Sequence, residues 1–367
     1  MEVIMQKTTP VIYLANASSP HVRHWIEFLD EMHMPYHIYS IHQNTFFSDD
    51  KVTVKYNFLT RFGGGGAILA YFFLGLWLRF FIGKSILHAH NTSGYGLSAL
   101  LSGKPYIVTT YGTEIFGADK RSSVYRLLID KILNKAKKIT TTSQQMEQVL
   151  VSKFHVNSKN ILTFGMGVSQ HFSFSNDKRE RIRAKLDIPM DAIVWIYNRR
   201  IMPLYNTIEV VQDFKKYSKD RPNAYLILMA GDHQASYTEL VKNELENTSN
   251  IFLVKGFLDP KDMSAYLSAS DISISVPNSD QLSSSILEAI ACGCYPILAN
   301  LPAYDEILDY VTCLSIDRNN LVRGFEQSGD LVLEQNSQLR SELLEQYKAT
   351  PWSRKTVIAL LNQVYAE

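Results

Sequence analysis

The sequence predicts an α/β protein built from two doubly wound domains with mainly parallel sheets. Two observations lead to this fold class. The chain of 367 residues exceeds the usual size of a single core, and short β-branched runs alternate with helical segments twice along it. The composition, 46% hydrophobic and 20% charged, is that of an ordinary globular protein. We therefore expect each half of the chain to bury its own core.

The first half begins the alternation of strands and helices. Runs rich in β-branched and aromatic residues, bounded by turn residues, predict strands at 11–16, 36–41, 85–91, 106–112, 138–143 and 161–167. Apolar residues at helical spacing predict helices at 21–33 and 124–138. Because strands that alternate with helices form parallel sheets, this half is predicted to be one domain.

The second half repeats this pattern, with strands predicted at 193–198, 225–231, 251–256, 271–276, 295–300 and 313–317. The polar, charge-rich run 173–185 lies between the halves and is interpreted as the joint. We predict a first domain over residues 1–172, a second over 173–351, and a final helix over 352–367 that completes the first domain. In such a pair of domains, ligands bind in a cleft that the carboxyl ends of the strands face.

The segment 67–82 is almost continuously apolar, interrupted by Arg79 and preceded by four glycines at 63–66. It falls short of the roughly 20 apolar residues that a transmembrane helix needs, so we do not expect it to span a bilayer. Two interpretations stay open: a buried core helix, or a helix at a membrane surface anchored by Arg79, Lys84 and aromatic residues. The glycines are expected to form a flexible loop.

Cysteine content and charge restrict the compartment and the partners. Three cysteines cannot make a disulfide framework, and no secretion signal is recognised, so we expect a cytoplasmic protein. Residues 1–180 hold 19 Lys and Arg against 12 Asp and Glu, whereas residues 181–367 hold 18 against 24. The basic half suits an anionic membrane or substrate, or attraction to the acidic half across a cleft. The sequence contains no dense stripe of Lys and Arg with interleaved aromatic residues, so we do not expect a nucleic-acid partner.

Two acidic residues and three consecutive serines gather in the run 279–293, "SDQLSSSILEAIACG". The predicted order of strand, loop and helix puts the serines at the amino end of a short helix, where free backbone N–H groups bind anions such as phosphate. Asp280 and Glu288 would then face one pocket. The alternative needs no ligand, because Ser285 and Glu288 match a capping box and Asp280 suits an Asx turn.

Several motifs together resemble those of the family 4 glycosyltransferases, which are retaining, nucleotide-sugar-dependent enzymes with the GT-B fold of two Rossmann-like domains facing a cleft. In the second half the motifs are "NRRIMP", "VPNSD", "LEAIACG", "YPILAN" and "DEIL". In the first half they are "NASSPHVRHWIEFL", "ILHAHN", "GKPYIVTTYGTEIFG", "ITTTS" and "GMGVSQHFSF". The resemblance covers nearly the whole chain and implies transfer of a sugar from a nucleotide diphosphate.

The resemblance also implies roles for residues of the second domain. Glu288 would bind the ribose hydroxyls of the donor, Asp280 the donor sugar, and Arg200 the diphosphate. A lysine of the family is replaced by Tyr205, so Arg199 or another residue must supply the second cation. The other predicted donor-binding residues are Leu282, Ser283, Ser284, Ser285 and Phe257.

The first domain would bind the acceptor. A histidine of the family is replaced by Tyr111, which keeps a hydrogen-bond donor but loses a group that titrates near neutrality. Ser19 and His21 in the opening loop and His90 at a strand end complete the predicted acceptor side, although His90 also suits a packed strand-end histidine. No His, Cys, Asp or Glu cluster has metal-ligand spacing, so we expect no metal and no other cofactor.

From this resemblance we expect a metal-independent hexosyltransferase that uses a UDP- or GDP-sugar and a glycan, lipid-linked or cell-envelope polysaccharide acceptor. The enzyme would be cytoplasmic and peripheral at the inner face of the cell membrane through Ala67 to Ile82. Two alternatives remain: a sugar-nucleotide epimerase of the same fold, and a non-catalytic sugar-binding or scaffold subunit, given the changes at Tyr111 and Tyr205. A nicotinamide dehydrogenase is disfavoured because no G-x-G-x-x-G follows the first strand.

Overall fold

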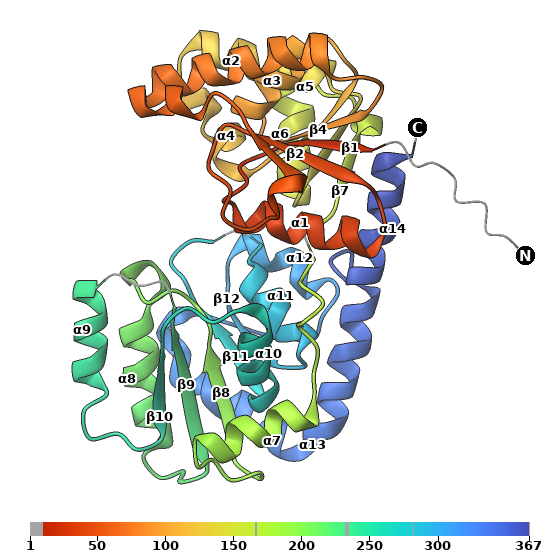
Figure 1. Ribbon diagram of the computed structural model, residues 1–367. Coiled ribbons are helices and arrows are strands. Elements are labelled where there is room, and N and C mark those ends of the chain that lie inside the picture. The colour runs from red at the N-terminus through yellow and green to blue at the C-terminus, as the bar shows by residue number, and fades with distance from the viewer. Residues whose placement is uncertain (1–9, 166, 232–234, 281, 367) are drawn as a thin grey trace, which may run out of the picture. The chain divides into compact units, whose positions relative to one another are not determined.

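The computed structural model describes residues 10–165, 167–231, 235–280 and 282–366, and the chain divides into two compact units (Figure 1). The first unit comprises Met1–Met166 and Val357–Glu367, and the second comprises Gly167–Thr356. In the described residues each unit is built on one parallel sheet packed against helices. The predicted fold class, α/β with two doubly wound domains, is therefore confirmed.

The first unit holds a seven-stranded sheet in the order β3-β2-β1-β4-β5-β6-β7. Its strands are β1 (Val11–Leu14), β2 (Tyr36–Ser40), β3 (Val52–Val54), β4 (Ile86–His90), β5 (Tyr106–Thr109), β6 (Lys138–Thr141) and β7 (Ile161–Thr163). All except the short edge strand β3 lie in predicted runs. At the centre of the sheet, Val11 of β1 is in register with Tyr36 of β2 and Ile86 of β4.

The helices of the first unit cover this sheet. They are α1 (Pro20–Glu31), α2 (Gly63–Phe81), α3 (Gly94–Ser102), α4 (Gly112–Phe116), α5 (Ser123–Lys135), α6 (Gln144–Phe154) and most of α14 (Arg354–Tyr365). Helix α1 starts with Pro20, whose fixed φ suits a first helical position, and buries Trp25 and Leu29. The sheet is therefore covered by apolar helix faces, as a parallel sheet requires.

Helix α14 brings the end of the chain back to the first unit. Val357 and Leu361 are buried in the same apolar cluster as Trp25 of α1. The hydroxyl of Tyr365 lies 2.8 Å from His88 Nδ1 on β4. The ammonium group of Lys138 donates to the last carbonyl groups of the helix, including those of Val364 at 3.1 Å and Ala366 at 3.0 Å. A cation at this end also suits the helix dipole.

Helix α2 differs from the prediction at its start. The glycines at 63–66 form its first turn rather than a flexible loop. Gly66 is required by close packing, because a Cβ atom there would lie 2.0 Å from the carbonyl oxygen of Leu59. Of the described helices, the stretch Asn57–Phe81 alone is long and apolar enough to cross a membrane, by length and composition.

The two faces of α2 have different surroundings. Ala70, Leu74 and Leu78 are fully buried in the core of the first unit. The rest of the helix surface and its carboxyl end expose large apolar side chains, namely Ile68, Leu69, Phe72, Phe73, Phe80 and Phe81. The helix therefore combines features of both interpretations: one face belongs to the core, and the other is apolar but exposed.

The second unit holds a six-stranded sheet in the order β10-β9-β8-β11-β12-β13. Its strands are β8 (Ile193–Tyr197), β9 (Ala224–Ala230), β10 (Ile251–Lys255), β11 (Ile272–Ser275), β12 (Tyr295–Ala299) and β13 (Leu314–Ile316). Each of them lies in or overlaps a predicted run. Strands β8 and β11, which are distant in sequence, are neighbours at the centre of the sheet.

The helices of this unit are α7 (Asn176–Lys185), α8 (Thr207–Ser218), α9 (Ala235–Glu244), α10 (Pro260–Ala269), α11 (Ser284–Ala291), α12 (Asp305–Leu308) and α13 (Leu321–Ala349). The polar run 173–185, interpreted as the joint, contains α7, whose Arg183 is fully buried. Helix α13 is kinked at Gln335, where φ is −138° and ψ is 20°. Kinks of this kind mark places where the regular ladder of hydrogen bonds is interrupted.

Candidate functional site

A buried ion pair lies at the carboxyl edge of the second sheet. Arg199 follows β8 and Asp280 follows β11, and because these parallel strands are neighbours, both residues reach the same edge. Arg199 Nη2 donates to Asp280 Oδ2 at 2.7 Å, and the two side chains are 5% and 14% exposed. The hydroxyl of Tyr304 donates to the same oxygen at 2.6 Å. Both of these hydrogen bonds end on Oδ2, and Asp280 Oδ1 takes part in neither of them.

Arg199 also joins this pair to the start of α11. Its Nη1 donates to the hydroxyl of Ser283 and, at 2.8 Å, to that of Ser285. Ser283 is the N-cap residue, but its side chain makes no capping hydrogen bond. The backbone N–H groups at the helix start are thus not satisfied by the cap side chain, which is the arrangement that binds anions. Arg199 is the cation next to this site.

The capping-box interpretation of Ser285 and Glu288 is wrong. Helix α11 begins at Ser284, so Ser285 lies inside the helix, where its hydroxyl accepts from Arg199. Glu288 lies in the second turn, half-buried, on the face that it shares with Ser285. Burial raises the pKa of the Cys292 thiol to about 12, and the Glu288 carboxylate adds to this increase.

The end of α11 explains the small residues that follow it. Gly293 has a φ of +75°, and its N–H donates to the Ile290 carbonyl at 2.8 Å. The N–H of Cys294 donates to the Ala289 carbonyl at 3.0 Å, which completes a Schellman motif. A Cβ atom at position 293 would lie 2.7 Å from Arg340 Cγ. Glycine is thus required by both conformation and packing.

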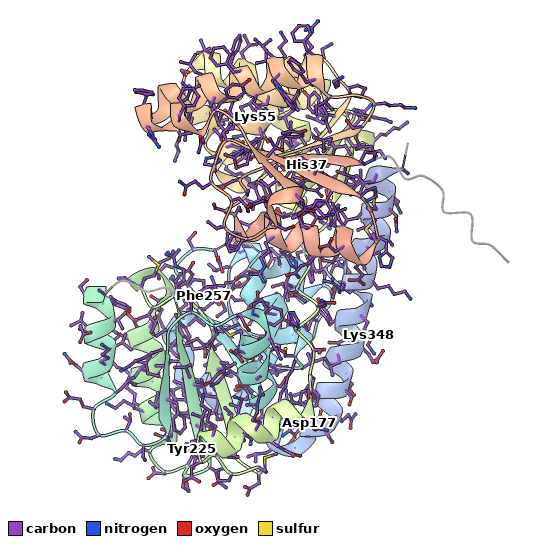
Figure 2. The ribbon with its side chains drawn as sticks, viewed as in Figure 1. His37, Lys55, Asp177, Tyr225, Phe257 and Lys348 are labelled. Atoms are coloured by element: carbon purple, nitrogen blue, oxygen red, sulfur yellow. The ribbon has the colours of Figure 1, made fainter. Side chains whose placement is uncertain are left out.

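The other predicted donor-side residues differ in exposure. Tyr205, which stands where the family has a lysine, lies beneath Arg199, with the guanidinium carbon 4.5 Å from its ring centroid. Arg200 and Ser284 are exposed, and Leu282 is partly buried against the core. Phe257 is exposed after the carboxyl end of β10 (Figure 2).

The four residues predicted on the acceptor side line one cavity of the first unit. Ser19 and His21 follow β1, His90 ends β4, and Tyr111 follows β5, and these strands are neighbours in the sheet. The cavity has a volume of about 300 Å³. Its other lining residues are Asn16, Val22, His42, Tyr71, Asn91 and Tyr95. Aromatic and uncharged polar groups therefore dominate its wall.

His90 is held neutral in this wall. It is 2% exposed, and its Nδ1 lies 2.8 Å from the Tyr111 hydroxyl. Nε2 has no hydrogen-bond partner among the described residues. Burial, and then the charges of His88 and His21, lower the pKa of His90 well below its ordinary value. His90 is therefore both a packed strand-end histidine and a cavity-lining residue.

The buried histidines predict a loss of stability in acid. Burial lowers the pKa of His88 to about 3, from an ordinary value near 6.5. Because the unfolded chain then binds protons that the folded protein does not, the free energy of unfolding should fall as the pH decreases from about 6.5 toward 3, by up to about 1.4 kcal/mol per pH unit for each histidine. Urea denaturation between pH 7 and pH 4 measures this slope. The slope should be smaller in His88→Asn, and an equal slope would contradict the assignment.

Some residues of these sites were not predicted. Asn16 and Asn91 line the first-unit cavity, and Asn198 donates to the Ser285 carbonyl at 2.8 Å. Each of these asparagines is the last residue of a predicted strand. Because ligands bind at the carboxyl ends of parallel strands, this position could have identified them as site residues. Tyr304, in the 3-10 turn Pro302–Tyr304, had no comparable signal. Among the described residues, no group of three or more His, Cys, Asp and Glu side chains is arranged to hold a metal ion.

Comparisons with known proteins bear on both units. Residues 19–171 match the family model described as glycosyltransferase family 4, and residues 178–347 match that described as glycosyl transferases group 1. No curated protein matches the sequence.

Solved structures share the fold at low sequence identity. HepE from Anabaena, in complex with UDP and glucose, has a TM-score of 0.73 at 12% identity, over 97% of this chain and 99% of the other. A glycosyltransferase from Rickettsia africae has a TM-score of 0.74 at 14% identity, over 98% of both chains. The sucrose-phosphate synthase of Thermosynechococcus elongatus has a TM-score of 0.70 at 15% identity, over 97% and 98%.

Proposed function

Because this chain belongs to the family 4 glycosyltransferases with the GT-B fold, we propose that it transfers a hexosyl group, with retention, from a UDP-sugar to a hydroxyl group of a glycan. The observation that carries the proposal is the cluster of Arg199, Asp280 and the serines at the start of α11. It offers a cation, helix N–H groups and a carboxylate at one sheet edge. The choice of UDP is supported by HepE from Anabaena, which was solved with UDP-glucose.

The donor would bind with its diphosphate at the start of α11. Negative charge develops on the diphosphate as the bond to the sugar breaks, and Arg199 and the helix N–H groups at the start of α11 would stabilise it. The guanidinium can hold two phosphate oxygens at once, so this protein cation would serve where other enzymes use a metal. Glu288 has the acceptor oxygens to bind two vicinal ribose hydroxyls.

Asp280 would orient the sugar. Its Oδ2 is held by Arg199 and Tyr304, which fixes the carboxylate, and its Oδ1, which takes part in neither of these bonds, would accept from a sugar hydroxyl. Burial and then the hydrogen bond to Asp280 raise the pKa of Tyr304, which therefore stays protonated as a donor. We expect Asp280→Asn to lower kcat far more than it weakens UDP binding, because the sugar changes charge in the transition state while the nucleotide does not. An unchanged kcat would restrict Asp280 to shaping the loop.

The acceptor would bind in the first-unit cavity. Its wall of tyrosine, histidine, asparagine and serine side chains suits a sugar ring, which stacks on aromatic faces and hydrogen-bonds through its hydroxyls. The neutral His90 and the hydroxyl of Tyr111 form a connected pair in this wall. We propose a lipid-linked or envelope-polysaccharide acceptor, because the same unit exposes the apolar face of α2.

That exposed face predicts association with the cytoplasmic surface of a membrane. Phe80 and Phe81 are 75% and 68% exposed at the end of α2, close in sequence to Arg79 and Lys84. Purified protein should sediment with anionic vesicles at low salt. The variant Phe80→Ser/Phe81→Ser should lose most of this binding but keep its melting temperature. If the protein ignores the vesicles, or the variant unfolds, the face belongs to the core.

A direct assay tests the function. Purified protein is incubated with labelled UDP- and GDP-sugars, with and without a lipid-linked or glycan acceptor extract and with a chelator present. We expect transfer from a UDP-sugar that survives chelation, and an α-linked product from an α-linked donor by NMR. Interconversion of free sugar nucleotides without an acceptor would indicate an epimerase. Donor binding without turnover would indicate a non-catalytic subunit.

A further inference from the structure

A second charged cluster lies at the amino edge of the second sheet, at the opposite end of β8 and β11 from Arg199 and Asp280. Asp271 directly precedes β11. Its Oδ1 accepts from Arg179 at 2.8 Å and from Arg340 at 2.9 Å, and its Oδ2 accepts from Arg183 at 2.8 Å. Three guanidinium groups therefore share one carboxylate.

The three guanidinium groups differ in how well their hydrogen-bond donors are paired with backbone carbonyl groups. Arg183 is fully buried and donates to several backbone carbonyl groups, including that of Ala269 at 2.9 Å. Arg179 and Arg340 are each 8% exposed, and their backbone contacts are longer, between 3.2 and 3.5 Å. Burial lowers the pKa of Arg340, and the charge of Arg179 contributes to this decrease. The cluster thus retains a surplus of buried positive charge, which is costly without a further anion.

Arg179 and Arg340 both line a cavity of about 600 Å³ within the second unit. Arg340 stacks on Phe174, with its guanidinium carbon 4.4 Å from the ring centroid, so the guanidinium plane is fixed. The α13 kink at Gln335 lies in the cavity wall. The other lining residues, mostly amides and hydroxyls, are Asn176, Glu334, Asn336, Ser337, Gln338, Ser341 and Leu344.

We propose that this cavity binds a sugar phosphate. The phosphate would complete the coordination of Arg179 and Arg340 through charge-assisted hydrogen bonds, which are the strongest that a protein offers a dianion. The amide and hydroxyl wall suits the hydroxyl groups of the sugar. Because the cavity is at the opposite sheet edge from Arg199 and Asp280, its ligand is separate from the sugar nucleotide, and the proposal does not depend on the transfer reaction.

Isothermal titration of the full-length protein tests the proposal, with saturating UDP present to occupy a donor site. The probes are glucose 6-phosphate, inorganic phosphate and glucose. We expect glucose 6-phosphate to bind about tenfold or more tightly than inorganic phosphate, and glucose to give no signal. Equal binding of phosphate and glucose 6-phosphate would reject the sugar part of the site. Absence of binding by both phosphate compounds would reject the site altogether.

Variants locate the binding. Arg179→Met leaves Asp271 with two arginine partners and should weaken glucose 6-phosphate binding about tenfold or more, since a hydrogen bond to a charged group is lost. Ser341→Phe adds a bulky side chain to the cavity wall while keeping all three arginines, and should have a similar effect. Arg181→Met, on the exposed face of α7, is the matched control and should change nothing. Glu334→Gln removes the acidic group of the wall and should tighten binding. Equal affinity in wild type, Arg179→Met and Ser341→Phe would overturn the proposal.

Discussion

Replacing Arg199 with methionine should lower the kcat of sugar transfer about 10²–10³-fold, the loss typical of removing one preorganised group that stabilises transition-state charge. The guanidinium of Arg199 contacts Asp280 and two of the three serines at the start of α11, so one substitution removes the cation from the whole cluster. Steady-state kinetics with the preferred donor measure the effect. The UDP affinity should fall less than kcat.

Two controls separate chemistry from folding. Arg199→Met leaves the carboxylate of Asp280 without its ion pair, which itself reduces stability. The double variant Arg199→Met/Asp280→Asn removes that unpaired charge, so it should regain melting temperature but not activity. Arg200→Met tests the adjacent, exposed arginine, to which the family resemblance assigns the diphosphate. Full activity in Arg199→Met, with loss in Arg200→Met, would transfer the role to Arg200.

Replacing Asp271 with asparagine should lower the free energy of unfolding of the second unit by about 3–5 kcal/mol, because it leaves buried guanidinium groups without their counter-charge. Asp271 also accepts the backbone N–H of Val194 at 2.9 Å, so the cluster ties α7 and α13 to the first residues of the central strands. Urea denaturation followed by the fluorescence of Trp195 and Trp352, both buried in this unit, measures the loss.

An exposed ion pair provides the control for this prediction. Glu345 and Lys348 are 2.5 Å apart on α13, with side chains 72% and 68% exposed. Water and salt screen such a pair, so Glu345→Gln should change the free energy of unfolding by less than about 1 kcal/mol. Similar losses for Asp271→Asn and Glu345→Gln would mean that the buried cluster contributes no more than a surface pair.

The strands were predictable from sequence because each needs only a short apolar run. β8 and β11 are fully buried, and such runs between turn residues differ clearly from their surroundings. Strand β3 has three residues at the sheet edge, too few to form a pattern. The prediction that the three serines lie at the amino end of a short helix is confirmed, with Ser283 as N-cap and α11 beginning at Ser284. The sequence did not show that Ser285 lies inside the helix and accepts from Arg199, because this depends on the residue at which the helix begins.

Site residues could be predicted from the sequence where the order of the strands in the sheet brings them together. They could not be predicted where the direction of a side chain decides which residue enters the site. Ser19, His90 and Tyr111 follow adjacent strands, so the sheet order brings them to one cavity. The local backbone after β8 decides which of the adjacent arginines turns toward Asp280, and a linear motif does not encode it. Arg179 and Arg183 lie one turn apart on α7, but no spacing in the sequence relates them to Arg340 on α13 or to Asp271.

The return of α14 to the first unit has a consequence for folding during synthesis. The apolar surface around Trp25 is covered by Val357 and Leu361, and Tyr13 and His88 have Tyr365 as their hydroxyl partner. At about 5–20 residues per second, the ribosome produces these partners on the order of tens of seconds after Met166. The second unit, a continuous segment, can fold in that interval. The domain made first is therefore the last to be completed, and until then its exposed apolar surface needs protection from aggregation.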